Sequence, residues 1–549
     1  MRVRGTVRAA IAEALQRSVR ELTADGAASD LELSRAKNPE HGDYASPAGP
    51  KLARILRRPP KEIAEQIVSA ISVPGGAAEA EAVNGYVNFR LSRRWLQELT
   101  HRVAAAGPAY GAIDAGRGER VQVEFLSTNP TGPLHIGHGR GAILGDTLAS
   151  VLSFAGYRVE REYYVNDFGG QARKFGQSIY ARYRGEEPPA GGYFGDYVTE
   201  LAELARREVP DVASMSPDAA AVRLGMWGCE QMIERFQKTL ARLRVRYDSW
   251  RYESRLWDEG LAAAARDQLS AAGLLREKDG ATWFAPALAD ESGDEEERVI
   301  TKSDGTHTYF ASDLGYLLDR FGRRGYDRVI EVWGADHYGY IPRIKSGMVA
   351  LGYEPARLVI VLNQMVSLKE GKMSKRQGRF VTLDELVDRV GVDAVRYFYL
   401  LRSPDAMMEF DLELAAAQGN ENPVYYAQYA HARLANVERF ASERRLPPEA
   451  DVSLLVEPWE LDLARQIAFW PEVVEEAARL YEPHRLAFYV HDLADQVHGF
   501  YQAGNRDWRH RVVVDDPALT RARLELCRAA RNTLKSALDL MGVSAPDQM

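Results

Sequence analysis

Two histidines that enclose a glycine form the segment of this chain best suited to chemistry. His135 and His138 lie on either side of Gly137, where an alternating, strand-like pattern changes into a helical one. Imidazole N–H groups can donate hydrogen bonds to phosphate oxygens, a glycine lets a nucleotide approach the backbone, and a helix N-terminus attracts negative charge. The segment therefore suits ATP, although histidines around a glycine also occur for structural reasons alone.

A basic, glycine-flanked segment, GKMSKR at 371–376, is the second candidate. Lys372 and Lys375 stand in it with Met373 and Ser374 between them, just before a helical pattern. Flexible lysines on such a loop can reach a triphosphate and stabilise the charge that develops as pyrophosphate leaves. A basic loop is more often only a solvated surface. The order of the two segments, and a separation large enough for half a nucleotide-binding sheet, favour a joint role.

A third candidate follows the strand-like stretch RVIEVW. Gly334 could let an adenosine approach the backbone, Asp336 could accept hydrogen bonds from ribose hydroxyls, and His337 comes directly after it. The carboxyl edge of an open α/β sheet is where such folds bind ligands. The alternative is that Asp336 only caps a helix.

The elements that position these residues can be predicted from periodicity. Residues 121–126 alternate between two faces, as in a strand, so Glu124 should point away from the valine face. A glycine-rich turn and a helix that ends at Gly156 follow. The later strands RVIEVWG and RLVIVLNQ, separated by helical stretches, indicate a parallel, doubly wound α/β sheet.

The chain divides into three predicted domains. Residues 1–108 read as an α+β unit, residues 115–409 as the parallel-sheet domain with a mostly helical insertion at about 160–300, and residues 410–549 as an all-α unit. The acidic tract DESGDEEER inside the insertion reads as a solvated loop. The last helix should begin at Asp516 and close at Gly542.

Composition excludes several classes of protein. Hydrophobic residues make up 46% and charged residues 27% of 549, which is typical of a globular protein. The N-terminus reads as an amphipathic helix rather than a signal peptide, and no run approaches the roughly eighteen apolar residues of a membrane span. We therefore expect a cytoplasmic protein that does not contact the membrane.

The cysteine count and the net charge restrict the possible ligands. Cys229 and Cys527 are the two cysteines of the chain, too few for a disulfide framework or a four-cysteine zinc site, so any metal would arrive with a substrate. A formal net charge of -8 gives no general sign of nucleic-acid binding. Such binding would depend on local basic patches, for example Lys51, Arg54, Arg57, Arg58 and Lys61.

The two phosphate-binding candidates together resemble the signature motifs HIGH and KMSKS of the class I aminoacyl-tRNA synthetases. They stand here as HIGH at 135–138 and KMSKR at 372–376. The resemblance implies a Rossmann-type catalytic domain in which both motifs hold ATP, with Mg²⁺, while an amino-acid carboxylate attacks the α-phosphate. It also implies that Lys375 stabilises the pentacoordinate phosphorus.

Further segments resemble the arginyl-tRNA synthetases over nearly the whole chain. NPEHGDYASPAGPKLARIL and AVNGYVNFRL are similar to the family's N-terminal domain, which contacts the tRNA elbow. RSPDAMMEFDLELAAAQGNENPVYYAQYAHARLANV resembles the junction into its anticodon-binding domain, and DLMGVSAPDQM its C-terminal end. The implied reaction activates L-arginine with ATP and esterifies it to the terminal adenosine of tRNA(Arg), in a protein that we expect to be a monomer.

Arginine recognition requires carboxylates that can pair with a planar guanidinium. Tyr309 and Asp313 stand four residues apart, so they share a face if their segment is helical. The resemblance assigns arginine binding to these two residues together with Glu124, Ser127 and Asn129. Taken singly, each is about as well explained by a cap, an ion pair or a core hydroxyl.

Aromatic residues on one predicted helix of the all-α unit could stack on unpaired anticodon bases. The cluster consists of Tyr425, Tyr426, Tyr429 and His431, and we assign tRNA contact to Tyr425 and Tyr429. The alternative is burial in the core, because helical aromatics bury large areas.

Three other functions remain open. A nucleotidyltransferase with a smaller substrate would leave the large helical unit unexplained. A catalytically idle paralogue would be expected to lose the charges that His135, His138, Lys372 and Lys375 retain. Other class I synthetases remain possible, but those with zinc knuckles need cysteines that this chain lacks.

Overall fold

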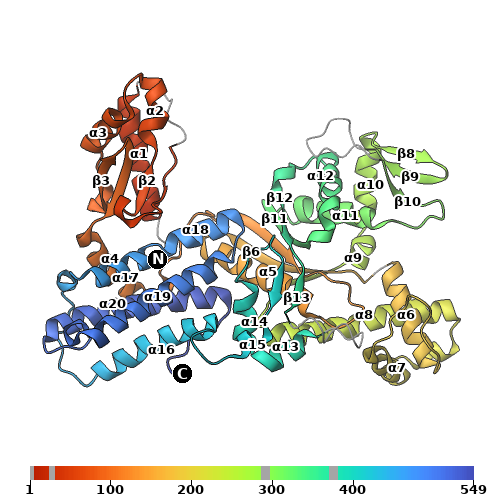
Figure 1. Ribbon diagram of the computed structural model, residues 1–549. Helices are drawn as coiled ribbons and strands as arrows, with labels where there is room; N and C mark the ends of the chain where they lie inside the picture. The colour runs from red at the N-terminus through yellow and green to blue at the C-terminus, as the bar shows by residue number, and fades with distance from the viewer. Residues whose placement is uncertain (1–4, 24–30, 168, 286–296, 370–380) are drawn as a thin grey trace.

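The computed structural model describes residues 5–23, 31–167, 169–285, 297–369 and 381–549 (Figure 1). Its N-terminal domain, in red, stands on the long C-terminal helices, in blue. The central domain lies beside these helices, and two groups of elements, α6 to α8 (within 170–242) and β8 to β10 (within 275–301), project from it on the side away from the N-terminal domain. The central domain carries the histidine pair predicted to bind ATP.

An antiparallel sheet with helices on it forms the N-terminal domain. Its strands lie in the order β1-β2-β4-β3. The bounds are Val7–Leu22 (α1), Ser34–Arg35 (β1), Tyr44–Ser46 (β2), Ala48–Leu56 (α2), Pro60–Ala70 (α3), Ala78–Val83 (β3) and Tyr86–Leu91 (β4). Asn84 and Gly85 join β3 to β4 with positive φ angles of 51° and 86°, as a tight hairpin turn requires. The predicted α+β class is confirmed.

Helix α4 (Arg93–Ala106) follows this sheet but packs in the C-terminal bundle. The amide of Gln97 donates to the carbonyl oxygens of Ser453 and Leu455, at 3.1 and 2.8 Å. His101 lies 3.0 Å from Glu525 on the last helix. The first predicted unit, residues 1–108, thus ends in a helix whose neighbours are those of the third.

Five parallel strands form the central sheet, in the order β12-β11-β5-β6-β7. Their bounds are Arg120–Phe125 (β5), Arg158–Val165 (β6), Ser249–Tyr252 (β7), Arg328–Gly334 (β11) and Leu358–Asn363 (β12). The strand order changes direction between β5 and β11, and open α/β sheets bind ligands beyond the carboxyl ends of strands at such a point. The predicted parallel sheet is confirmed, and it places the candidate crevice.

The interval predicted as a mostly helical insertion is more varied. Besides α6 (Gly170–Tyr183), α7 (Asp196–Glu208) and α8 (Pro217–Arg242), it holds β7 of the parallel sheet. It also contributes α9 (Glu253–Asp258), α10 (Leu261–Ala271) and a three-stranded antiparallel sheet of β8 (Leu275–Lys278), β9 (Ala281–Phe284) and β10 (Arg298–Thr301). Most of the acidic tract, 290–296, lies outside the described residues.

Helix α5 (Ile136–Phe154) crosses the sheet and is buried along most of its length. Strands β5, β6 and β11 cover one side, and α13 (Leu383–Val390), α14 (Val392–Tyr399) and C-terminal helices cover others. A Cβ on Gly145 would lie 2.1 Å from the ring of Phe125, so glycine is required for this close approach. Elements of two domains therefore enclose the helix.

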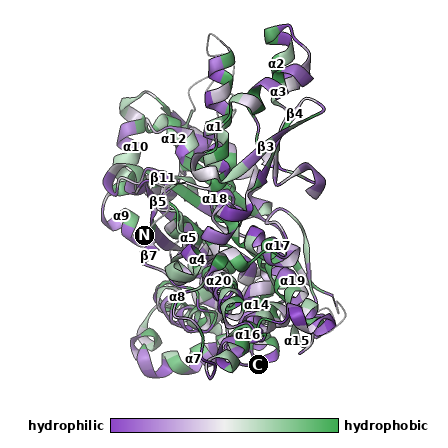
Figure 2. Cartoon of the chain, turned by 90° about the vertical axis from the view of Figure 1, so that its left-hand side faces the viewer, coloured by the Kyte–Doolittle hydropathy of each residue, from purple (hydrophilic) through white to green (hydrophobic). Residues whose placement is uncertain are grey.

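Helices dominate the chain after β14 (Met408–Phe410), as expected. They are α15 (Leu412–Ala416), α16 (Pro423–Ala441), α17 (Pro458–Ala468), α18 (Trp470–Leu480), α19 (Arg485–Arg506) and α20 (Pro517–Met541). Asp516 caps α20 and Gly542 closes it in the left-handed conformation, as predicted. Hydrophobic and hydrophilic residues alternate along these helices in Figure 2, which is typical of amphipathic packing. Across the described ranges, none of the helices has the length and apolarity of a membrane span.

A buried arginine joins the central domain to the C-terminal helices. Arg396 on α14 donates to the carbonyl oxygens of Met541 and Leu243, at 2.6 and 2.8 Å, and to the carboxylate of Asp146 at 2.7 Å. These partners end α20, end α8 and lie within α5, respectively. The two domains are therefore connected beneath the helix that carries the histidine pair.

Candidate active site

The two histidines begin helix α5 as neutral hydrogen-bond donors. The Nδ1 atom of His135 accepts from the backbone of Gly137 (3.1 Å), and that of His138 accepts from the backbone of His135 (3.3 Å). Their rings stack with centroids 3.6 Å apart. Burial lowers the pKa of both, that of His138 to about 3 with a further contribution from His135. Since each Nδ1 accepts, each neutral ring carries its proton on Nε2, as phosphate binding needs.

The second motif segment lies outside the described residues, and the first described residues after it lie beside the histidines. Lys372, Met373, Ser374 and Lys375 lie in 370–380, outside the described ranges. The chain re-enters at Val381, whose carbonyl oxygen accepts from Ile136, and Leu383 donates to Leu134.

These two backbone hydrogen bonds measure 3.2 and 2.9 Å. A Cβ on Gly139 would lie 2.6 Å from the Leu383 side chain, so α13 packs directly on the start of α5. The tertiary structure thus brings the flank of one motif against the other.

The third candidate group lies at the carboxyl end of β11, next to β5. Gly334 is the last residue of the strand, and Asp336 and His337 lie on the short 3₁₀ turn Ala335–Tyr340. The side chains of Asp336 and His337 are exposed, with Oδ2 and Nε2 3.7 Å apart. The group is therefore accessible from the predicted crevice.

Glu124 is buried at the end of β5 within a charged cluster. Its Oε2 lies 3.1 Å from the guanidinium of Arg320, which also pairs with Glu331, the residue opposite Glu124 on β11. Burial and then Glu331 raise the pKa of Glu124, while Arg320 opposes the rise. Glu124 points away from the valine face, as predicted, toward the guanidinium of Arg320.

The loop after β5 is strained. Leu126 and Ser127 have positive φ angles of 70° and 28°, which residues with a side chain rarely adopt. The hydroxyl of Ser127 accepts from the backbone of Tyr164 at 3.1 Å, and Asn129 is exposed on the same loop. Strain of this kind concentrates where a ligand site must be shaped.

Tyr309 and Asp313 share a face of helix α11 (Tyr309–Leu317), as their spacing predicts. Half of Tyr309 is exposed, whereas Asp313 is partly buried and accepts a hydrogen bond from Tyr340. Burial raises the pKa of Asp313 to about 6, although the Tyr340 bond opposes this. Glu331 and Arg320 also act on Asp313, so the structure brings it to the cluster around Glu124.

Two residues that the sequence reasoning missed complete this region. Glu253, directly after β7, is buried; burial raises its pKa to about 7, a hydrogen bond from Ser312 lowers it, and Asp313 raises it. Arg320 lies on a π-helical turn, Leu318–Arg323, of a kind that often marks functional sites. Glu253 lies just after a strand and Arg320 lies in an irregular helical turn, and hydrophobic periodicity does not identify residues at such positions.

Arg140 was also missed, and it anchors the start of α5. Its guanidinium donates to the carbonyl oxygens of Gln364 (3.1 Å), Ala406 (2.7 Å) and Ser403 (2.7 Å). Burial lowers its pKa to about 10. The side chain therefore ties the histidine-bearing helix to the end of β12 through backbone carbonyl oxygens.

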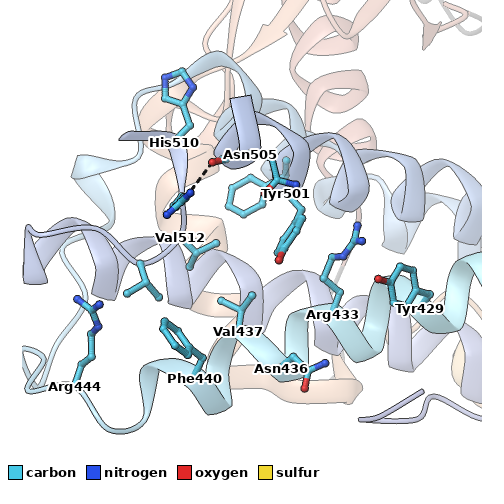
Figure 3. A pocket seen from close by; sticks show the side chains of 14 residues that line it. Tyr429, Arg433, Asn436, Val437, Phe440, Arg444, Tyr501, Asn505, His510 and Val512 are labelled. Atoms are coloured by element: carbon cyan, nitrogen blue, oxygen red, sulfur yellow. Dashed lines mark hydrogen bonds between the residues drawn. The ribbon is translucent and has the colours of Figure 1, made fainter. Parts of the chain in front are cut away.

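A cavity of about 550 Å³ opens in the C-terminal domain (Figure 3). Tyr429 lines it, and Arg433 lies between the rings of Tyr429 and Tyr501, 4.5 and 4.3 Å from their centroids. Exposed Phe440 and Arg444 line the wall nearer the end of α16. Aromatic faces beside guanidinium groups are suited to a nucleobase and its phosphates.

The other predicted aromatics of α16 have different surroundings. Tyr425 stacks on Tyr429 with centroids 6.2 Å apart but does not line the cavity. Tyr426 bonds to Asp495, and His431 is buried with its Nδ1 2.9 Å from the carbonyl oxygen of Pro546. The predicted cluster therefore divides between surface and core.

Three family models match the chain in succession. They are the "Arginyl tRNA synthetase N terminal domain" over residues 5–91, "tRNA synthetases class I (R), catalytic domain" over 105–436 and "DALR anticodon binding domain" over 427–549. An arginine–tRNA ligase of Dehalococcoides mccartyi is 40% identical over 559 residues, covering 100% of this chain and 99% of that protein. The chain belongs to the arginine–tRNA ligase family.

Other members agree with this assignment. The arginine–tRNA ligase of Bacillus subtilis is 43% identical over 537 residues, 94% of each chain. The solved arginyl-tRNA synthetase of Thermus thermophilus matches with a TM-score of 0.79 and 25% identity, covering 99% of this chain and 100% of that one. The N-terminal sheet, the parallel-sheet domain and the helical bundle are thus the architecture of arginine–tRNA ligases.

Proposed function

We propose that the chain activates L-arginine with ATP and transfers the arginyl group to the terminal adenosine of tRNA(Arg). Family membership supports this, and one structural observation carries the site assignment. The flank of the lysine segment hydrogen-bonds to the histidine segment at the N-terminus of α5, at the carboxyl edge of the sheet, beside a cluster of buried carboxylates. Phosphate donors and a cation pocket are what the reaction requires.

ATP is proposed to lie across the ends of β5 and β11. His135 and His138 would donate from Nε2 to phosphate oxygens, with the backbone at Gly137 close to the nucleotide. Gly334, Asp336 and His337 would adjoin the adenosine. Lys372, Met373, Ser374 and Lys375 would close over the triphosphate, where Lys375 neutralises developing charge.

Magnesium is proposed to enter with ATP. In the part of the chain that the structure describes, His, Cys, Asp and Glu side chains form no group of three that could bind a metal ion. The imidazoles at the start of α5 instead present N–H donors, which suit phosphate oxygens rather than a cation. When bound, the ion would supply charge neutralisation of the triphosphate.

Arginine is proposed to lie beneath the end of β5. Glu253 and Asp313 would pair with its guanidinium, and Tyr309 would cover it. Glu124, Ser127 and Asn129 would hold the α-amino group near the phosphates. The protein then positions the arginine carboxylate for attack on the α-phosphate, and no side chain forms a covalent bond to it.

Transfer RNA is proposed to span all three domains. Tyr429, with Tyr425 beside it, would receive bases of the anticodon loop at the cavity of Figure 3. The basic residues of α2 and α3 would meet phosphates of the tRNA elbow. A cytoplasmic monomer remains a prediction, which cell fractionation and sedimentation would test.

Arginine-dependent exchange of pyrophosphate into ATP tests the proposal. Exchange should require arginine, and it is measured with and without tRNA(Arg) to test whether activation needs bound tRNA. Absence of exchange under both conditions would remove the assignment. Exchange without tRNA would show that the arginine and ATP sites are complete in the free chain.

A further inference from the structure

One buried hydroxyl beside the proposed arginine site has no hydrogen-bond partner in the described part of the chain. Tyr164 lies near the end of β6, and its ring packs on Tyr316 with centroids 4.6 Å apart. Its hydroxyl oxygen is inaccessible to solvent and has no hydrogen-bond partner among the described residues. By contrast, the adjacent Tyr163 donates to Thr128 (2.8 Å), and Tyr316 donates to Glu162 (2.6 Å). A buried polar group left unpaired costs free energy and calls for an explanation.

Three carboxylates act on this hydroxyl. After burial, the fields of Glu253, Asp313 and Glu124 raise the pKa of Tyr164 well above its ordinary value. The phenol therefore keeps its proton at neutral pH. A protonated hydroxyl among carboxylates still has an oxygen lone pair that can accept a hydrogen bond, and a guanidinium has five N–H donors.

The packing keeps the hydroxyl in place. The ring of Tyr164 rests on Tyr316, and the guanidinium of Arg320 covers Tyr316 at 3.8 Å from its centroid. The backbone N–H of Tyr164 donates to Ser127 on the strained loop. The hydroxyl is thus held at a fixed position between β6 and α11 before any ligand binds.

The guanidinium end of the pocket is the side on which this hydroxyl lies. The arginine carboxylate must reach the triphosphate near His138, which contacts Thr128 on the loop after β5. The α-amino group then falls near Glu124. The far end of the substrate falls toward α9 and α11, which adjoin Tyr164: Tyr164 pairs with Arg251 on β7, two residues before Glu253, and its ring packs on Tyr316 of α11.

We propose that Tyr164 is a specificity-determining residue whose hydroxyl accepts an N–H from the substrate guanidinium. This inference rests on the proposed function and adds a residue to its arginine site. The carboxylates supply charge, whereas the hydroxyl supplies a neutral acceptor at a fixed position. A site that hydrogen-bonds a substrate N–H rejects analogues that lack it, because its buried polar groups would then stay unpaired.

The substitution Tyr164→Phe removes only this oxygen and keeps the ring on Tyr316. A hydrogen bond to a charged group predicts a rise of roughly 10- to 100-fold in the KM for arginine, with the KM for ATP unchanged. The Tm of the free chain should not fall, because no hydrogen bond is lost there. Tyr489→Phe is the matched control, since that buried hydroxyl donates to Gln466 at 2.9 Å in the C-terminal domain. It should lower Tm and leave the arginine KM unchanged.

Calorimetric titration with arginine separates this inference from the proposed function. If the wild-type chain binds arginine but neither exchanges pyrophosphate nor charges tRNA, the proposed function fails while the role of Tyr164 stands on the weaker binding of Tyr164→Phe. An unchanged arginine affinity in Tyr164→Phe, or a Tm loss equal to that of Tyr489→Phe, would overturn the inference. Agmatine keeps the guanidinium but lacks the carboxylate, and its affinity should fall in Tyr164→Phe by the same factor as that of arginine. An agmatine affinity equal to that of the wild type would also overturn the inference.

Discussion

At the scale of single residues, burial controls the protonation of the site. The histidines at the start of α5 are held neutral, while Glu253 and Asp313 are pushed toward their protonated forms. Neutral imidazoles donate to phosphate without titrating in the physiological range. Carboxylates whose pKa values are raised by burial release protons when a cation binds beside them.

Replacing His138 should mainly slow the chemical step. His138→Gln removes a preorganised donor at the helix N-terminus, and the rate of arginine-dependent pyrophosphate exchange should fall by about 100-fold. His101→Gln, which changes an exposed histidine of α4, should leave the rate unchanged. Equal rates in the wild type and His138→Gln would show that this histidine does not contact the phosphates.

Arginine binding should strengthen as pH rises from 6 to 8 and should release protons. The pKa values of Asp313 and Glu253 in the free chain are raised to about 6 and about 7, so both carry protons below those values. A guanidinium favours their ionised forms and lowers both pKa values on binding. Calorimetry at pH 6.5 in buffers with different ionisation enthalpies measures the protons released. A heat that is the same in every buffer would contradict the prediction.

At the scale of elements, the side chain of Arg140 holds the N-terminal part of α5 in place. Arg140→Ala would leave the carbonyl oxygens of Gln364, Ser403 and Ala406 without their donor. The free energy of unfolding should therefore fall by about 3 kcal/mol. Urea denaturation measures it, and Arg94→Ala, at a fully exposed pair with Glu98, serves as the control that should not change stability. A loss no larger than in the control would show that backbone packing alone holds α5.

At the scale of the whole molecule, Arg396 couples the domains through Asp146. Arg396→Met should lower the free energy of unfolding by about 3 kcal/mol, because the buried carboxylate of Asp146 loses its partner at 2.7 Å and keeps only Arg161, at 3.5 Å. Adding Asp146→Asn should recover part of that loss, since the buried charge that only Arg161 still faces is then removed. A double variant no more stable than Arg396→Met would show that the carbonyl contacts of Arg396, not the ion pair, connect the domains.

The N-terminal domain is attached by a separate set of contacts. Arg8 pairs with Glu475 at 3.2 Å, Arg465 pairs with Asp43 at 2.8 Å, and the hydroxyl of Tyr44 donates to buried Glu472. All of them join it to α17 and α18 rather than to the central sheet. The domain proposed to meet the tRNA elbow is thus carried by the domain proposed to bind the anticodon.

The sequence by itself determined the elements and the family. Alternation along β5, the cap and the terminal glycine of α20, and two short phosphate-binding motifs are local patterns, so they can be recognised without knowing how the chain folds back. They were enough to predict the parallel sheet and the helical C-terminal domain. The family resemblance assigned arginine binding to Glu124 and Asp313, but it did not show which residues surround them.

Only the tertiary structure decided which charges meet. The register of β5 on β11 sets Glu124 opposite Glu331, and a π-helical turn far along the chain places Arg320 between them. The roles proposed for Glu253 and Tyr164 depend likewise on β6, β7 and α11 coming together at one edge of the sheet. Burial shifts pKa values and leaves hydroxyls unpaired, and burial is a property of the packed molecule that no local pattern in the sequence records.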